Sequence, residues 1–370
     1  MTVNLRIPGP TPIPDDILTA SSKQMINHRG PEFKDLIESV TEKTKAVFNT
    51  TKDLYILTAS GTGGMEAALV NTISPGDKVL AITVGIFGNR FVQIAKAYGA
   101  DVTVLSTEYG KAIDPDEVKK ALDADTSIKA VIVTHNETST GITNDLENIS
   151  KVVKGQFGKL LLVDAISSIG SIPCQVDQWD LDIVVSGSQK GWMSPPGLSM
   201  VSVSEKAWEA YKESKTPKFY FDLMPAKRYL ERAQTPWTPA VGVMFALESA
   251  LDKLEAEGMN NVHERHAKIG KMCREGVKSI GLQLFADESH ASNTVTAVRI
   301  PDNVNAAELL GTMRTEYSVV LAGGQADLEG KIFRIGHLGY CSESDIQNVI
   351  ESLVSSFEKL GVNPEKVSLP

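Results

Sequence analysis

Seven short apolar runs alternate with stretches of helical periodicity over the first part of the chain. Several runs are apolar throughout, which is typical of strands covered by helices on both faces of a parallel sheet. The spacing between them fits strand–helix–strand units. The runs occupy residues 54–58, 78–84, 101–106, 129–135, 159–165, 181–187 and 198–204. The pattern predicts an α/β fold with a large, mostly parallel seven-stranded sheet flanked by helices.

The two ends of the chain follow other patterns. Four prolines between residues 8 and 14 exclude a helix there, so we expect an extended N-terminal arm over residues 1–15. A helix is expected at 31–48, and beyond about Val241 helical and strand-like stretches mix. The late helical stretches are 241–258, 263–280 and 343–360, and the strand-like runs are 293–300 and 331–337. We therefore predict a large domain over residues 16–258 and a smaller C-terminal α+β domain over residues 259–370.

Composition narrows the class of partners. Of the 370 residues, 42% are hydrophobic and 22% are charged, as in an ordinary globular protein. The net charge of −9, without a local cluster of lysine and arginine, argues against nucleic-acid binding. No run approaches the ~18 apolar residues of a membrane span, and no signal peptide is evident, so no membrane association is expected. Cys174, Cys273 and Cys341 are far apart, which indicates reduced thiols and a cytoplasmic protein.

Small and polar residues follow the first predicted strand, at the edge where open α/β sheets bind ligands. They are Ser60-Gly61-Thr62-Gly63-Gly64, and a helical segment comes next. Free backbone N–H groups at such a helix start favour a phosphate, and the two hydroxyl groups add donors. A plain tight turn is the alternative. A dinucleotide site is disfavoured because Glu66 stands where the third glycine of G-x-G-x-x-G belongs.

Later strand ends add further candidate groups. Phe87, between two glycines, could offer a flat face to a ring, although such an aromatic is more often core. A polar cluster at 136–141 could hydrogen-bond ring substituents. Asp164 ends an apolar run, where a carboxylate needs a cationic partner. Lys190 follows another apolar run, although a single lysine is ordinarily solvent-exposed. A phosphate cradle, an aromatic, a buried acid and a strand-end lysine are together what pyridoxal 5′-phosphate (PLP) requires.

The sequence resembles the class V aminotransferases, which are fold-type I PLP enzymes, and within them the alanine–glyoxylate and serine–pyruvate aminotransferases. The resemblance covers nearly the whole chain. Its motifs are PGPTPIP (8–14), INHRGPEF (26–33), SGTGGMEAAL (60–69), GIFGNR (85–90), THNETSTG (134–141), LLVDAISSIG (161–170), SGSQKGWMSPPG (186–197), TPAV (238–241) and FRIGHLG (333–339). It implies PLP-dependent transamination of alanine or serine with glyoxylate or pyruvate. It also implies a homodimer whose active site is shared across the interface.

The resemblance further implies roles for individual residues. Lys190 is similar to the lysine that forms the Schiff base and shuttles the proton, and Asp164 to the partner of the pyridinium nitrogen. Arg334 resembles the arginine that binds the substrate carboxylate, a bidentate task suited to guanidinium. Gly9 would line the substrate cavity, and Thr238 would reach the phosphate from the neighbouring subunit. The other implied cofactor contacts are Ser60, Gly61, Thr62 and Gln189 at the phosphate, Phe87 and Ile166 on the ring faces, and Thr138 near the ring hydroxyl.

Some positions depart from relatives. Thr62 replaces a histidine, and Thr235 stands where certain relatives have a phosphate-binding tyrosine, so Thr235 is left out of the predicted site. The pair Gly191-Trp192 also differs and could alter the pocket. No basic group evident in the sequence awaits a second substrate carboxylate, which favours small amino acids.

Other functions remain as alternatives. A cysteine desulfurase would need a loop cysteine before Arg334, and residues 320–331 contain none. A phosphoserine or 2-aminoethylphosphonate aminotransferase would need further cations, and a non-catalytic scaffold would not need the lysine, aspartate and arginine named above. His263 and His266 could suggest a metal, but a solvated helix face is the simpler interpretation, and no metal is expected.

Overall fold

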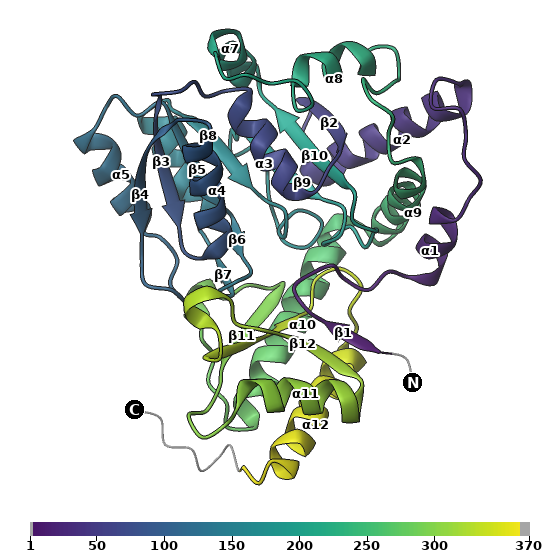
Figure 1. The fold of residues 1–370 in the computed structure, drawn as a ribbon, viewed down its shortest axis with the longest axis vertical. Helices are drawn as coiled ribbons and strands as arrows, with labels where there is room; N and C mark the ends of the chain where they lie inside the picture. Colours follow the sequence, from purple (N-terminus) through teal and green to yellow (C-terminus); the bar gives the residue numbers. More distant parts are fainter. Residues whose placement is uncertain (1–2, 363–370) are drawn as a thin grey trace.

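The computed structural model describes residues 3–362, which form two main sheets with helices packed around them (Figure 1). The larger sheet confirms the predicted mostly parallel arrangement of seven strands. Among the described strands of this sheet, only β10 runs antiparallel to its neighbours. In spatial order they are β2 (Asp53–Thr58), β10 (Leu198–Val203), β9 (Ile183–Gly187), β8 (Leu160–Asp164), β5 (Ala130–Thr134), β3 (Lys78–Thr83) and β4 (Asp101–Ser106).

Helices cover both faces of this sheet because successive side chains of its central strands point to opposite sides. On β5, Val131 and Val133 belong to one core cluster, and Ala130 and Ile132 belong to the other. Burial on both faces explains why the runs are apolar throughout. The first cluster includes side chains of α2 (Pro31–Phe48), α5 (Pro115–Ala124), α6 (Leu146–Ser150) and α9 (Val241–Glu257), and the second includes side chains of α3 (Gly61–Val70), α4 (Ile86–Ala97), α7 (Glu205–Glu213) and α8 (Leu223–Leu230).

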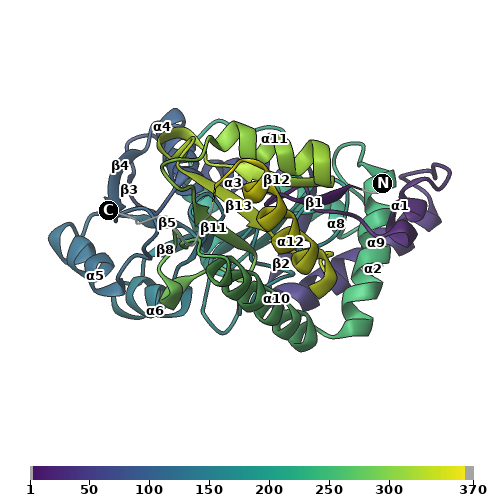
Figure 2. The same ribbon diagram turned by 90° about the horizontal axis from the view of Figure 1, so that it is seen from below.

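The smaller sheet has four strands, two of which the sequence pattern does not predict. Its order is β1 (Asn4–Arg6), β12 (Val319–Gly323), β13 (Ile332–Gly336) and β11 (Val295–Arg299). β1 pairs in parallel with β12, so part of the expected arm is a strand of this sheet. Figure 2 shows α10 (Met259–Ser279), α11 (Ala306–Tyr317) and α12 (Glu343–Lys359) grouped with these strands.

Shorter elements complete the chain. They are α1 (Asp15–Ser21), the hairpin of β6 (Asn136–Glu137) and β7 (Ile142–Thr143), a π-helical turn (Lys151–Gln156) and two 3₁₀ turns (Glu288–His290 and Ala326–Leu328). α9 and α10 meet at Gly258, whose φ of +79° suits glycine. The domain boundaries after residues 15 and 258 stay a prediction. In residues 3–362, no helix is long and apolar enough to cross a membrane.

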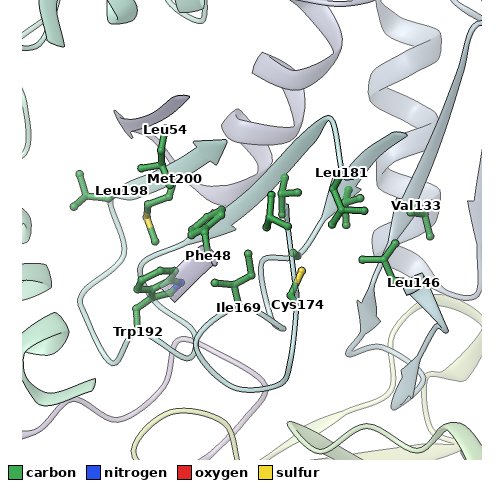
Figure 3. Close-up of a cluster of buried hydrophobic side chains, with 14 of the residues drawn as sticks. Phe48, Leu54, Val133, Leu146, Ile169, Cys174, Leu181, Trp192, Leu198 and Met200 are labelled. Atoms are coloured by element: carbon green, nitrogen blue, oxygen red, sulfur yellow. The ribbon is translucent and has the colours of Figure 1, made fainter. Parts of the chain in front are cut away.

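Trp192 lies in the core beside the large sheet, among the buried side chains of Figure 3. It is fully buried, and its indole Nε1 donates to Ser186 Oγ at 2.8 Å. Its ring centroid is 5.8 Å from that of Phe48. A tryptophan can be buried at low cost when its N–H has a partner, as here.

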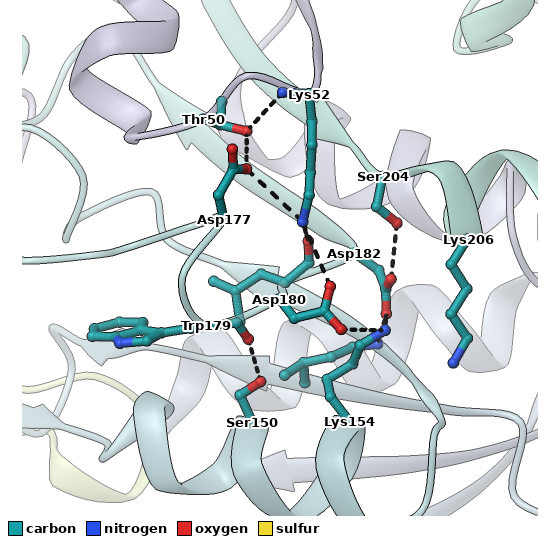
Figure 4. A network of polar contacts seen from close by, with 12 residues as sticks. Thr50, Lys52, Ser150, Lys154, Asp177, Trp179, Asp180, Asp182, Ser204 and Lys206 are labelled. Carbon is teal, nitrogen blue, oxygen red and sulfur yellow. Dashed lines mark hydrogen bonds and ion pairs between the residues drawn. The ribbon is translucent and has the colours of Figure 1, made fainter.

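A polar network occupies the amino end of β9, opposite to the carboxyl edge of the parallel strands (Figure 4). The fully buried Asp182 carboxylate accepts hydrogen bonds from Lys154 Nζ at 2.6 Å, Leu161 N at 2.9 Å and Ser204 Oγ at 2.8 Å. Each of these bonds joins segments distant in sequence, so the network holds the amino ends of β8 and β9 together.

Candidate active site

A cavity of about 220 Å³ lies at the carboxyl edge of the large sheet, beyond the ends of β2, β3, β5, β8 and β9. It brings together nearly all the residues that the sequence predicts for a cofactor site. Its lining consists of Gly9, Ser60, Gly61, Thr62, Met65, Phe87, Arg90, Asn136, Thr138, Asp164, Ile166, Ser167, Gln189 and Lys190. Neither Gly191 nor Trp192 is in this lining, and Trp192 belongs to the core.

The amino end of α3 forms one wall of the cavity. Ser60 is the N-cap, but its side chain makes no capping hydrogen bond, and the first N–H groups of a helix have no partner within the helix. A Cβ on Gly61 would lie 2.4 Å from Ile166 Cδ1, so glycine here lets the Ile166 side chain pack directly against the helix start. Gln189 Oε1 is buried without a hydrogen-bond partner within residues 3–362. Unpaired N–H donors at a helix start are suited to hold a small anion.

Asp164, the last residue of β8, presents a buried carboxylate to the cavity. Its Oδ1 accepts from Ile166 N at 3.0 Å, and its Oδ2 accepts from Thr134 Oγ1 at 3.2 Å. Burial raises the pKa of Asp164 to about 6, although these hydrogen bonds oppose the shift. A cation bound near this carboxylate would favour its ionised form.

Lys190 lies three residues beyond the end of β9 and is partly exposed to the cavity. Desolvation lowers the pKa of Lys190 to about 8, Asp164 opposes this shift, and the positive charges of Arg334 and Arg90 add to it. The lysine therefore carries a larger neutral fraction near neutral pH than a solvated lysine does. A neutral amine is the form that attacks a carbonyl carbon.

The N-terminal segment closes the cavity over this lysine. Lys190 Nζ donates to the carbonyl oxygen of Pro8 at 2.5 Å. Thr11 N donates to the carbonyl of Gln189, and Thr11 Oγ1 donates to the carbonyl of Lys190, both at 3.1 Å. Gly9 has a φ of +130°, and a Cβ there would lie 2.6 Å from Lys190 Nζ, so this position requires glycine.

Arg334 and Thr238 are the two predicted site residues that do not line the cavity. Arg334, on β13, is buried, and it donates from Nε and Nη2 to the carbonyl of Gly323 at 3.0 and 2.8 Å. Its Nη1 donates to the carbonyl of the cavity residue Thr138 at 3.2 Å. Burial lowers the pKa of Arg334 to about 10, and the charge of Glu137 opposes this. Thr238 is exposed, and its role toward a neighbouring subunit stays a prediction.

Comparison with known proteins agrees with this geometry. Residues 5–349 match the family Aminotransferase class-V. The chain belongs to the class-V aminotransferases. This family is PLP-dependent, so the predicted family, fold class and enzyme class are confirmed.

Individual relatives extend over nearly the whole chain. A serine–glyoxylate aminotransferase of Methylorubrum extorquens is 38% identical over 97% of this chain and 92% of its own length. A protein of Synechococcus sp. named soluble hydrogenase, small subunit, is 43% identical over 96% of this chain and 93% of its own. The crystal structure of an alanine–glyoxylate aminotransferase from Nostoc sp. superposes with a TM-score of 0.93, at 30% identity over 96% of each chain.

Three cavity residues of this aminotransferase are not predicted as site residues from the sequence: Met65, Arg90 and Ser167. Asn136, which belongs to the polar cluster 136–141, also lines the cavity. Arg90 places in the cavity a basic group that is not evident as a site residue in the sequence. Its guanidinium carbon lies 4.9 Å from the ring centroid of Phe87, and Nη1 is 3.5 Å from Thr62 Oγ1. The sequence could have identified Arg90, because it follows the predicted site residue Phe87 by three positions at the start of a helix and so lies on the same helix face.

The expectation for His266 of α10 is corrected. His266 is fully buried rather than on a solvated face, and its Nε2 accepts from Gly339 N at 3.0 Å while Nδ1 lies 2.7 Å from the carbonyl of Val262. Burial lowers the pKa of His266 to about 3. It therefore serves as a neutral structural link between α10 and the loop after β13. Over residues 3–362, no group of three or more His, Cys, Asp or Glu side chains is arranged to hold a metal ion.

Proposed function

We propose that this aminotransferase binds PLP in the 220 Å³ cavity and transfers the amino group of a small amino acid to a small 2-oxo acid. One observation carries the proposal: a desolvated lysine and a buried carboxylate line the same small cavity as an unpaired helix start. PLP, when bound, supplies an aldehyde for an amine and an electron sink for the carbanion at the substrate α-carbon.

The residues present fit this cofactor. The α3 start, with Ser60, Gly61, Thr62 and Gln189, would hold the phosphate, and the unpaired N–H groups at that helix start support the assignment. Phe87, Ile166 and Thr138 line the cavity and would contact the ring. Asp164 would pair with the ring nitrogen, and that pairing would offset the cost of its burial.

Lys190 would act as nucleophile toward the aldehyde and afterwards as the base that moves the α-proton. Its depressed pKa of about 8 matches that role, because a base works best when its pKa lies near the operating pH. Arg334 would bind the α-carboxylate with the N–H groups that its two carbonyl partners leave free.

Alanine or serine is the expected donor, and glyoxylate or pyruvate the expected acceptor. The named activities of the Methylorubrum and Nostoc relatives support this choice of substrates.

Arg90 favours a second candidate, a donor with two carboxylates such as aspartate. Its guanidinium lines the cavity, and no carboxylate oxygen of the described chain lies within 4.0 Å of it. An unpaired guanidinium beside a substrate site suits a distal carboxylate.

We further propose a cytoplasmic homodimer in which Thr238 of one protomer completes the site of the other. Thr238 is exposed, and nearby Phe219, whose ring lies 5.0 Å from Trp237, is 75% exposed. Tyr220 is also exposed and stacks on Trp237, and such a cluster of exposed aromatics supports a contact surface here. The three cysteines are buried and unpaired, which agrees with a reducing compartment.

The test combines cofactor binding with a substrate screen. Wild type should acquire a visible absorption band on addition of PLP, and Lys190→Ala should bind PLP without that band and lose transamination. Lys119→Ala, on an exposed face of α5, is the matched control and should behave as wild type. Alanine, serine, glycine, aspartate and 2-aminoethylphosphonate are then tested against glyoxylate and pyruvate.

Two outcomes would decide against the proposal. A wild type that shows no band and no transfer would favour the scaffold alternative. Full activity in Lys190→Ala would overturn the role of this lysine. If aspartate is the preferred donor, Arg90→Gln should remove that preference while alanine turnover persists, and an unchanged preference would reject the second candidate.

A further inference from the structure

Glu137 is a buried carboxylate next to the active site that the proposed chemistry does not use. It lies on β6, is fully buried, and does not line the cavity. Its Oε2 accepts from Phe87 N and Gly88 N, both at 3.0 Å. Its Oε1 accepts from Ser139 N at 3.1 Å and Ser139 Oγ at 2.6 Å. The Glu137 carboxylate therefore accepts four hydrogen bonds and donates none.

These contacts cap α4 from a different part of the chain. The N-cap of α4 is Gly85, which has no side chain to satisfy the first N–H groups of the helix. Ser139 Oγ accepts from Ile86 N at 2.9 Å, and Glu137 accepts the next two N–H groups. A Cβ on Gly85 would lie 2.4 Å from Ser139 Oγ, which shows how closely the two segments pack. Negative charge at a helix start is also favoured by the helix dipole.

The first turn of α4 is part of the active-site wall. Phe87 and Arg90 both line the cavity, and both side chains leave the helix within four residues of its capped end. A shift of the capped N–H groups would therefore move the ring of Phe87 and the guanidinium of Arg90 together.

The other side of Glu137 leads to the proposed carboxylate-binding group. Thr138, its neighbour in sequence, lines the cavity and accepts from Arg334 Nη1 through its carbonyl. The negative charge of Glu137 also favours the charged form of Arg334. Glu137 thus contacts the helix that carries Phe87, and its neighbour Thr138 contacts Arg334 on β13.

We propose that Glu137 is a positioning residue that fixes the separation between the ring surface of Phe87 and the guanidinium of Arg334. The inference rests on the proposed roles of those two residues. A carboxylate is required because Glu137→Gln keeps the size of the side chain but replaces one acceptor oxygen by an NH₂ donor. That NH₂ would face either the two α4 N–H groups, which would both lose their acceptor, or Ser139, whose N–H would lose its acceptor while the hydroxyl would have to turn and accept.

The experiment compares Glu137→Gln with Asp182→Asn. Asp182 is an equally buried carboxylate that accepts a backbone N–H, but it lies at the opposite end of the sheet. For each variant and for wild type, the measurements are thermal unfolding, the Kd for PLP by absorbance titration, and KM and kcat for the amino donor.

Both variants should lose thermal stability, but only Glu137→Gln should raise the Kd for PLP and the donor KM, each by about tenfold, which corresponds to one charge-assisted hydrogen bond. Asp182→Asn should leave both constants within about twofold of wild type. Equal changes in the two variants, or constants for Glu137→Gln within twofold of wild type, would overturn the proposal.

A second variant covers the case in which Glu137→Gln fails to fold. Ser139→Ala removes one cap of α4 and one donor to Glu137, and should shift both constants in the same direction by a smaller factor. Wild-type constants in Ser139→Ala would then overturn the proposal. A wild type that neither binds PLP nor transfers an amino group would instead reject the proposed function, so the two failures are distinguishable.

Discussion

Arg334→Lys tests whether the guanidinium fork of Arg334 binds the substrate. A guanidinium has five N–H donors, and three of those of Arg334 reach the carbonyls of Gly323 and Thr138. One N–H on each terminal nitrogen is left, and two parallel donors match a carboxylate. A lysine ammonium offers three donors from one point, so it cannot serve both carbonyls and both carboxylate oxygens.

The expected loss is one charge-assisted hydrogen bond to the substrate, about 1.5–3 kcal/mol. That corresponds to a fall of about 10- to 150-fold in kcat/KM for the amino donor. Steady-state kinetics measure the loss, and a thermal melt checks folding, because Arg334 is also buried. Arg299→Lys, at an exposed position on the adjacent strand β11, is the matched control and should keep wild-type kinetics. A folded Arg334→Lys enzyme with unchanged kcat/KM would refute the reasoning.

Two further predictions concern stability. Asp164→Asn should abolish transamination but stabilise the cofactor-free protein at pH 8 by up to about 3 kcal/mol. Folding raises the pKa of Asp164 from 3.8 to about 6, so above pH 6 the ionised carboxylate destabilises the folded state. This gain in stability should shrink as the pH falls through 6 towards 4, because the carboxyl group of the folded wild type then binds its proton. Denaturant unfolding at a series of pH values measures the trend, and its absence would show that the pKa of Asp164 is unperturbed. Trp192→Phe should cost about 1–3 kcal/mol, because the buried Ser186 hydroxyl loses its indole donor, with kcat/KM unchanged. A changed donor preference in Trp192→Phe would show that the pair Gly191-Trp192 does shape the pocket.

The sequence predicts the large sheet well because its central strands, such as β5, β8 and β9, are buried on both faces and so are nearly continuous apolar runs. It predicts the cavity residues at strand ends for a related reason, since parallel strands bring their carboxyl ends to one edge. The small sheet is harder to predict. β1 has three residues and depends on pairing with β12, and so has little local signal of its own.

Residues whose role depends on contacts distant in sequence are also missed. Glu137 looks like one polar residue in a polar loop, and only the folded chain shows that it caps α4. His266 follows a helical pattern that mixes charged and apolar positions, so its burial depends on the loop that contains Gly339. Arg90 could have been found, because helical spacing alone places it beside Phe87.

The pairing of β1 with β12 has a consequence for biosynthesis. The ribosome makes Pro8, whose carbonyl holds Lys190, near the start of synthesis, whereas β12 begins only at Val319. At about 5–20 residues per second, this interval lasts roughly 15 seconds to a minute. Until then β1 has no strand to pair with, and the lid over the lysine has no anchor. Nascent chains stalled before β12 should therefore leave Lys190 open to solvent, and a lysine-reactive probe should label it in them more readily than in the completed chain.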